Sequence, residues 1–326
     1  MKTSAILGTG SALPAKVVSN DDLAKIVDTN DEWIRERTGI VNRRIAVDET
    51  VTTMSIEAAT KALEDAKLSA KDLGLIIVAT ITPDGAMPNA ACKVQAAIGA
   101  TNAMCYDINA ACSGFMYGLQ TAHAFISASL LKHVLVVGAE TLSKILDWND
   151  RSTCVLFGDG AGAVVLGPSE NGILAIEGGA DGVKGVALML GNRPLVNPYT
   201  KHEAVQPYVE MDGQAVFKFA VRTIPHILNS LSEKTNIPLE DLDLILLHQA
   251  NKRIIEAAAR RLKLSEDMFP MNLDKYGNTS AASIAILLDE VNKSGKLKNG
   301  DKIALAGFGG GLTWAGLMLE WKKDEL

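Results

Sequence analysis

Several patterns that mark common classes of protein are scarce or missing in this chain of 326 residues. Positive charge is not in excess, because 32 Lys and Arg stand against 38 Asp and Glu, and the net charge of −6 predicts no broad nucleic-acid-binding surface. No apolar run reaches the roughly 20 residues that cross a bilayer, so we expect no membrane partner. Metal-ligand spacings are missing as well, and we expect no metal site.

Cysteine is also sparse. The chain has Cys92, Cys105, Cys112 and Cys154, and no two of them form a CxxC pair. No secretory signal precedes them, since residues 2–8 are better interpreted as a short buried strand. Both observations favour reduced thiols over disulfides, and we expect the protein in the cytoplasm.

Strand-like and helix-like segments, in contrast, alternate along the whole chain, which predicts an α/β fold. Continuous apolar runs predict strands at 73–80, 134–138, 161–166, 242–247 and 303–306. Apolar residues at helical spacing predict helices at 52–66, 89–98, 115–130, 216–234, 253–262 and 284–292. The segment 181–208 is predicted to be a long loop over a site.

An internal repeat organises these segments. Residues 72–77 resemble 241–246, Asn109 with its small neighbours resembles Asn278, and 134–138 resembles 303–307, so that each landmark recurs 169 positions later. The alternative is that the strands resemble one another by chance, but chance does not explain why all three landmarks recur at the same spacing. We expect two pseudo-symmetric halves, residues 1–170 and 171–326, whose matching strand ends converge on one cleft.

Cys112 is the first candidate for a catalytic residue. It lies between an apolar run and a helix-like segment, so the thiol is placed at a helix N-terminus. There, free N–H groups and the helix dipole favour the reactive thiolate. The small residues Ala110, Ala111 and Gly114 leave room for a substrate carbonyl. The alternative is a buried, inert cysteine.

Three further places, at the ends of predicted strands or in a turn, are candidates for the same site. His248 is the one histidine of five that ends an apolar strand, although a hydrogen-bonded core histidine is the alternative. Asn278 is either a turn or cap residue or a second polar group of the site. The glycine-rich segment 307–311 is either a flexible turn or a source of backbone N–H groups for an oxyanion.

Five motifs together resemble the β-ketoacyl-acyl-carrier-protein synthase III family of thiolase-fold condensing enzymes. They are DEWIRERTGI at 31–40, NAACSGF at 109–115, HQAN at 248–251, GNTS at 277–280 and GFGGG at 307–311. The motifs stand in the family's order and cover the whole chain. The resemblance implies an α/β, thiolase-like fold of two halves in a layered αβαβα arrangement, and a homodimer.

The resemblance also implies a reaction. Cys112 would attack a short acyl-CoA, acetyl-CoA by default, to give an acyl-enzyme and free coenzyme A. The backbone N–H groups of Cys112 and Gly310 would form the oxyanion hole. Malonyl-acyl carrier protein would then lose CO2, with the enolate held by His248 and Asn278, and its carbanion would attack the acyl-enzyme. The CoA thioester is a substrate, and no cofactor is expected.

The same resemblance assigns the binding residues. Coenzyme A would contact Trp33, Arg37, Thr38, Arg151 and Asn251, with the adenine stacked on Trp33 and Arg151. The acidic carrier protein would dock on Gln249, Ala250, Asn251, Lys252 and Arg253, next to further basic residues of the following helix. The acyl pocket would be lined by Met87, Leu142 and Phe157. Solvated charges and ordinary packing are the alternatives for these residues.

Rival functions make different demands on the sequence. A thiolase needs a second cysteine in 307–311, which has none, and an elongating synthase has a histidine where Asn278 stands. A related acyltransferase that does not condense, a condensing enzyme of specialised metabolism, and a non-catalytic acyl-CoA-binding homologue stay open. The presence of Cys112, His248 and Asn278 together argues against the last.

Overall fold

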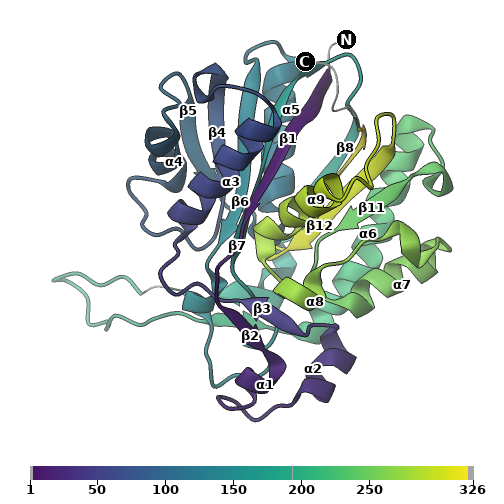
Figure 1. The fold of residues 1–326 in the computed structure, drawn as a ribbon. Helices are drawn as coiled ribbons and strands as arrows, with labels where there is room; N and C mark the ends of the chain where they lie inside the picture. The colour runs from purple at the N-terminus through teal and green to yellow at the C-terminus, as the bar shows by residue number, and fades with distance from the viewer. Residues whose placement is uncertain (1–2, 193, 322–326) are drawn as a thin grey trace.

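Two β-sheets with the same strand order form the centre of the computed structural model, which describes residues 3–192 and 194–321 (Figure 1). The first sheet has the order β1-β7-β6-β4-β5 and the second the order β8-β13-β12-β11. The first sheet consists of β1 (Thr3–Ala12), β7 (Gly160–Ser169), β6 (His133–Glu140), β4 (Leu73–Ala79) and β5 (Met104–Ile108). The second consists of β8 (Ile173–Ala180), β13 (Thr313–Glu320), β12 (Lys302–Gly309) and β11 (Leu244–Leu247). Each of the first four strands of the first sheet therefore has a counterpart in the second.

Helices cover both faces of each sheet. The long helices are α3 (Val51–Asp65), α4 (Ala90–Ile98), α5 (Gly114–Ser127), α6 (Gly213–Thr235), α7 (Lys252–Leu262) and α9 (Ser283–Lys293). Helices α5 and α9 share one hydrophobic core between the two sheets, while α3 with α4 and α6 with α7 form separate cores on the outer faces. These layers confirm the predicted αβαβα arrangement, because each sheet and each central helix buries two apolar faces.

Shorter elements surround this framework. They are the strand pairs β2 (Val17–Ser19) with β3 (Asn42–Arg44) and β9 (Leu188–Leu190) with β10 (Val209–Met211), and the helices α1 (Asn20–Leu23), α2 (Asp31–Thr38) and α8 (Leu273–Tyr276). The predicted loop 181–208 thus contains the strand β9. Its later part projects from the body as an arm between β9 and β10 (Figure 1).

The internal repeat is preserved in the backbone. The 3-10 turn η2 (Ala111–Ser113) and α5 recur 169 positions later as η7 (Ser280–Ala282) and α9. Even an unusual conformation recurs, since Ala111 has φ +46° and Ser280 has φ +48°. The matching strand-to-helix turns of the two halves therefore have the same shape.

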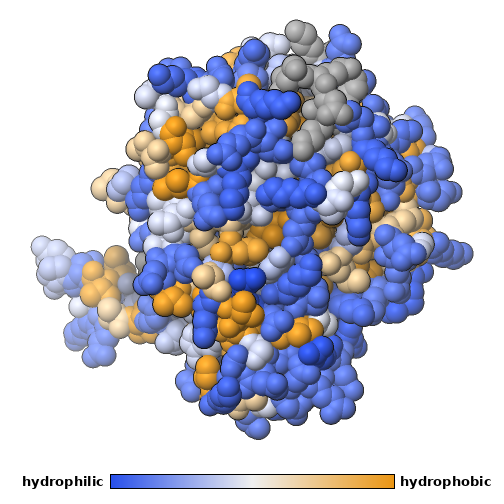
Figure 2. Space-filling model, in the orientation of Figure 1, coloured by the Kyte–Doolittle hydropathy of each residue, from blue (hydrophilic) through white to orange (hydrophobic). Residues whose placement is uncertain are grey.

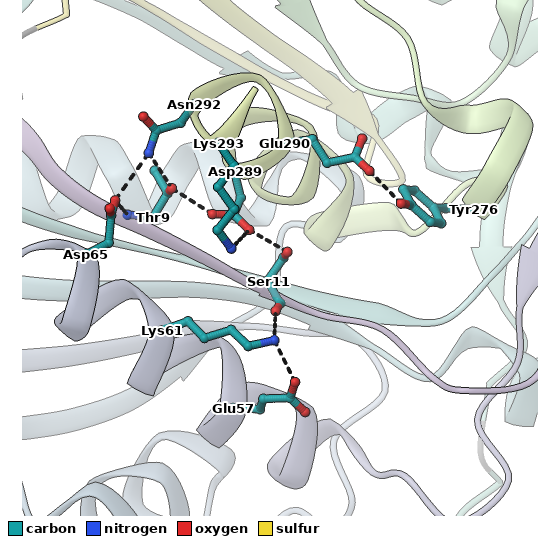
Figure 3. A network of polar contacts seen from close by, with 10 residues as sticks. All are labelled: Thr9, Ser11, Glu57, Lys61, Asp65, Tyr276, Asp289, Glu290, Asn292 and Lys293. Carbon is teal, nitrogen blue, oxygen red and sulfur yellow. Dashed lines mark hydrogen bonds and ion pairs between the residues drawn. The ribbon is translucent and has the colours of Figure 1, made fainter. Parts of the chain in front are cut away.

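A buried polar network joins the halves away from these turns (Figure 3). The Asp289 carboxylate of α9 accepts hydrogen bonds from Thr9 Oγ1 at 2.7 Å and Ser11 Oγ at 2.5 Å, both on β1. Lys293 Nζ lies 2.7 Å from the same carboxylate, and Asn292 donates to Thr9 and to Asp65 of α3. The network fastens the central helix of one half to the sheet of the other.

Replacing Asp289 with alanine is expected to lower the free energy of unfolding by about 2–4 kcal/mol, because buried hydroxyls lose their acceptor. The matched control is Lys293→Ala, which removes only the half-exposed partner and should cost less than about 1 kcal/mol. Urea unfolding measures both variants. Equal losses for the two would contradict a buried role for Asp289.

Candidate active site

Cys112 lies in the turn η2, between the end of β5 and the start of α5, as the sequence predicts. Its side chain is 7% exposed. The end of β12 packs directly on this turn, because a Cβ atom added at Gly309 would lie 2.7 Å from the Cys112 nitrogen. Only glycine at 309 therefore allows the second half of the chain to approach the nucleophile turn so closely.

The surroundings of Cys112 shift the pKa of its thiol in both directions. Burial raises the pKa of the thiol to about 12, while a hydrogen bond with Ser280 lowers it and the charge of Glu140 raises it. The helix N-terminus is predicted to favour the thiolate, and burial acts on this thiol in the opposite direction. A buried thiol with a raised pKa needs a proton acceptor when it reacts.

His248 follows β11 and is almost completely buried, and its Nδ1 lies 2.6 Å from Ser283 Oγ. The Ser283 oxygen also accepts from the Gln249 N–H at 3.4 Å. When the Ser283 hydroxyl donates to Nδ1, a neutral imidazole carries its proton on Nε2. Burial lowers the pKa of His248 to about 3. The imidazole is therefore neutral, and with Ser283 as the donor to Nδ1 it presents Nε2–H as a hydrogen-bond donor.

Asn278 presents a second neutral donor. Its Oδ1 accepts from the Ser280 N–H at 2.9 Å, which leaves the side-chain NH2 group as the end that can donate to a ligand. The main chain of Asn278 is fixed by hydrogen bonds with Leu156 O at 2.8 Å and the Gly158 N–H at 3.0 Å. The side chain is 7% exposed and thus reaches its surroundings only through the cavity described next.

Two cavities meet at Cys112. We call the smaller one the outer cavity and the larger one the inner cavity. The outer cavity, of about 110 Å³, is lined by Cys112, His248, Asn278, Asn251, Phe217 and Phe308. The inner cavity, of about 520 Å³, is lined by Cys112, Leu142, Phe157, Val209, Ser280 and Gly310. The structure thus brings together the three predicted catalytic residues, the second predicted oxyanion residue and two of the three predicted acyl-pocket residues. Met87 lines neither cavity and is 91% exposed.

The predicted coenzyme A residues gather near the outer cavity. The Arg37 and Arg151 guanidinium carbons lie 4.5 Å and 5.1 Å from the centre of the Trp33 ring. Asn251 caps α7 and donates from Nδ2 to the Arg37 carbonyl at 2.9 Å, which ties this cluster to the cavity. Thr38 is buried, and its hydroxyl donates to Ile34 O at 2.6 Å. Its side chain therefore stabilises the last turn of α2.

The predicted carrier-protein segment is only partly at the surface. Lys252 and Arg253 are exposed, and the Arg253 guanidinium lies 5.8 Å from the Phe217 ring centre. Gln249 is 1% exposed, and its amide binds Leu247 O and the Asn272 N–H. Its side chain therefore faces the interior and is not available to a docking protein, because it joins β11 to the segment before α8.

Sequence reasoning missed two residues that hold the site. Ser283 orients His248, and Glu140, at the end of β6, accepts a hydrogen bond from Ser280 Oγ at 3.2 Å. Ser283 follows the GNTS motif by three positions, and a polar residue at the start of an apolar helix was a weak indication. Glu140 ends an apolar strand as His248 does, and the same position argument would have found it.

Comparison with known proteins agrees with this geometry. Residues 106–182 match the family described as 3-oxoacyl-[acyl-carrier-protein (ACP)] synthase III, and residues 232–321 match its C-terminal part. A Clostridium botulinum protein named beta-ketoacyl-[acyl-carrier-protein] synthase III is 51% identical over 324 residues, which are 98% of this chain and 99% of that protein. The chain belongs to the β-ketoacyl-acyl-carrier-protein synthase III family.

Solved structures of synthase III enzymes have the same fold. The 3-oxoacyl-[acyl-carrier-protein] synthase III of Aquifex aeolicus has a TM-score of 0.91 and 48% identity, covering 98% of this chain and all of the other. The priming β-ketosynthase of the R1128 polyketide pathway has a TM-score of 0.93 and 36% identity, covering 99% and 97%. The predicted thiolase-like fold is confirmed by these synthase III structures.

Residues 3–192 and 194–321 contain neither a helix that could span a membrane nor a cluster of metal ligands. No helix there combines the length and the apolar character needed to cross a membrane. No group of three or more His, Cys, Asp or Glu side chains in these ranges is arranged to hold a metal ion.

Proposed function

We propose that this protein condenses a short acyl-CoA, acetyl-CoA by default, with malonyl-acyl carrier protein to start fatty acid synthesis. The products are a 3-oxoacyl carrier protein, CO2 and coenzyme A. The observation that carries the proposal is the meeting of Cys112, His248 and Asn278 at one cavity, from two halves of the chain. One thiol and two neutral donors are the groups that acyl transfer followed by decarboxylation requires.

In the first half-reaction the Cys112 sulfur attacks the thioester carbonyl of acyl-CoA. The oxygen becomes negative as the tetrahedral intermediate forms, and the N–H groups of Cys112 and Gly310 stabilise it. Collapse releases coenzyme A and leaves the acyl group on Cys112. The inner cavity holds that group between Leu142 and Phe157.

In the second half-reaction malonyl-carrier protein enters by the outer cavity. Loss of CO2 places negative charge on its thioester oxygen, which His248 Nε2–H and Asn278 NH2 stabilise. Neutral donors suit this step, because neither has to change its protonation state as the charge develops. The carbanion attacks the acyl group on Cys112, and the 3-oxoacyl carrier protein leaves.

Ser283→Ala tests the role of the imidazole orientation. Without the Ser283 hydroxyl the Nε2–H form of His248 is no longer favoured, so release of CO2 should slow by about 10-fold, which corresponds to about 1.4 kcal/mol. Acylation of Cys112 does not use His248 and should keep its rate, which makes it the internal control. An equal fall in both rates would mean that Ser283 is only a packing residue.

The substrates would bind on one side of the molecule. Trp33 and Arg151 would hold the adenine between them, Arg37 would meet a phosphate, and Asn251 would line the path of the pantetheine arm. The exposed basic residues near the opening, Lys252, Arg253, Arg260, Arg261 and Lys218, would attract an acidic carrier protein. Metal and cofactor have no part in this proposal, since coenzyme A arrives as a substrate thioester.

The proposal includes a cytoplasmic homodimer built from chains with the halves 1–170 and 171–326. The offset of 169 residues between matching elements supports the division into halves. Strand β5 ends its sheet, its Met104 is 51% exposed, and Met87 is 91% exposed, which supports pairing with a second copy. Figure 2 shows hydrophobic surface on the side where Figure 1 places β5. Met87 would then line the partner's acyl pocket.

The proposal is tested by following the malonyl carboxyl carbon. With acyl-CoA and malonyl-carrier protein, we expect CO2 and a 3-oxoacyl carrier protein in equal amounts. Transfer of the acyl group to an acceptor without CO2 would indicate an acyltransferase. Binding of acyl-CoA without either product would indicate a non-catalytic homologue.

A further inference from the structure

Glu140 is a buried carboxylate that the reaction scheme above does not use. It is 0% exposed and accepts hydrogen bonds from Thr80 Oγ1 at 3.2 Å, from the Ile81 N–H, from the Thr82 hydroxyl and from Ser280 Oγ at 3.2 Å. None of these donors carries a charge. Burial raises the pKa of Glu140 to about 7, so the carboxyl can take up or release a proton under working conditions.

Ser280 connects this carboxyl to the nucleophile. Its hydroxyl donates to Glu140 Oε1, and the same hydroxyl lies close enough to the Cys112 sulfur to lower the pKa of the thiol. Ser280 is 1% exposed and lines the inner cavity beside Cys112. The main-chain N–H of Ser280 is held by Asn278 Oδ1, which keeps the hydroxyl in place between sulfur and carboxyl.

The fold alone does not require this pair of residues. The repeat places Ala111 at the position that corresponds to Ser280, and the two share the same positive φ. It places Gly309, the last residue of β12, at the position that corresponds to Glu140, the last residue of β6. One half therefore builds this turn and strand end without a hydroxyl and without a carboxylate, which argues that Ser280 and Glu140 serve the chemistry.

We propose that Glu140 is a positioning residue that accepts the Cys112 proton through Ser280 when the acyl-enzyme forms. This inference rests on the proposed function. The S–H proton passes to Ser280 Oγ while the Ser280 hydroxyl proton passes to Glu140 Oε1. The sulfur then forms its bond to the acyl carbon, and the bond from that carbon to the sulfur of coenzyme A breaks. The departing thiolate takes the proton back by the same route, and Glu140 is ionised again.

This proton route avoids two negative charges in the buried site. When Glu140 takes up the proton it becomes neutral, so only the sulfur carries negative charge. Ionising Cys112 beside an ionised Glu140 would leave two charges in a buried site. Cys112 is the titratable group that faces the carboxyl. Charged groups on neighbouring elements have their own partners: Lys144 binds the carbonyls of Thr82 and Pro83, Asp159 binds Ser143, and Asp107 binds the N–H groups of Ala90 and Ala91.

The test measures the alkylation rate of Cys112 by iodoacetamide against pH, with peptide mapping by mass spectrometry. The unmodified enzyme should show a rise with a midpoint near pH 7, followed by a plateau. Glu140→Gln and Ser280→Ala should each react about 100-fold more slowly at neutral pH and lose the plateau. The double variant should be no slower than either single variant, because both remove one route. Exposed Cys92 gives the reference rate.

Slower or faster alkylation of Cys112 in Glu140→Gln distinguishes a proton acceptor from a fixed charge. If Glu140 acted only as a fixed charge, its removal would lower the pKa of Cys112 and speed alkylation, and that result would overturn the proposal. An unchanged profile in Ser280→Ala would overturn it too. That variant should fold, because Ala111 adopts the same backbone conformation, and it carries the test if Glu140→Gln does not fold.

Thr80→Val is the matched control. It removes one donor to the carboxylate but leaves the route through Ser280, so the plateau should persist with its midpoint at higher pH. Iodoacetamide needs no acyl-CoA, and the outcome is therefore independent of the proposed substrate. An enzyme that shows the pH profile but forms no acyl-enzyme would contradict the proposed function and leave the proton route standing.

Discussion

Cys112→Ala is expected to abolish formation of the acyl-enzyme and to lower condensation by about 10⁴-fold or more, because no other group supplies the nucleophile. Release of CO2 from malonyl-carrier protein should continue. The donors for the enolate oxygen, His248 and Asn278, lie on other elements and keep their own partners, Ser283 and Ser280. The variant should therefore separate decarboxylation from carbon–carbon bond formation.

Intact-protein mass and CO2 release measure these two effects. Cys92→Ala is the matched control, since Cys92 is exposed on α4 and lines neither cavity. It should acylate and condense normally. Acylation that persists in Cys112→Ala would place the acyl group on another residue and contradict the assignment of the nucleophile.

His248→Ala is expected to have the opposite effect. Acylation of Cys112 should proceed, while release of CO2 should fall by about 10²- to 10³-fold, as is typical when one preorganised oxyanion donor is removed. Asn278→Ala should give a loss of similar size in the same step. Burial keeps the pKa of His248 at about 3, so the imidazole stays neutral and its protonation should add no pH dependence above about pH 5.

Rapid-quench measurement of the two half-reactions separates these effects. His202→Ala is the control, because His202 lies exposed on the projecting arm. Two results would contradict the role of His248 as a neutral donor in the second step. One is a His248 variant that fails to acylate, and the other is a variant that releases CO2 normally at low pH. Either would mean that the imidazole acts as a base in the first step.

Much of the fold could be predicted because its elements have strong local patterns. Strand β6 is buried along its whole length and is apolar from Val134 to Ala139, and α3 and α9 begin and end within one residue of the predicted bounds. The segment 181–208 has no such pattern, and its strand β9 exists only because β10 pairs with it across the base of the arm.

The residues of the candidate site also divide into those that the sequence predicts and those that it does not. Cys112, His248 and Asn278 stand at ends of strands or in turns, where motifs are visible in the sequence. The pKa of Cys112 could not be predicted, because it depends on burial by residues distant in the sequence, such as Gly309, which packs on the Cys112 backbone. Glu140 and Ser280 are 140 residues apart, so their contact has no local pattern. Gln249 turned inward because Asn272 offers it a partner there.

The most direct test of the central claim is the intact mass of the protein after mixing with acetyl-CoA and then with malonyl-carrier protein. We expect a gain of one acetyl group on Cys112, and its disappearance as the 3-oxoacyl carrier protein forms. An acetyl group that stays on the protein in the presence of malonyl-carrier protein, or that leaves without release of CO2, would contradict the claim that this site condenses.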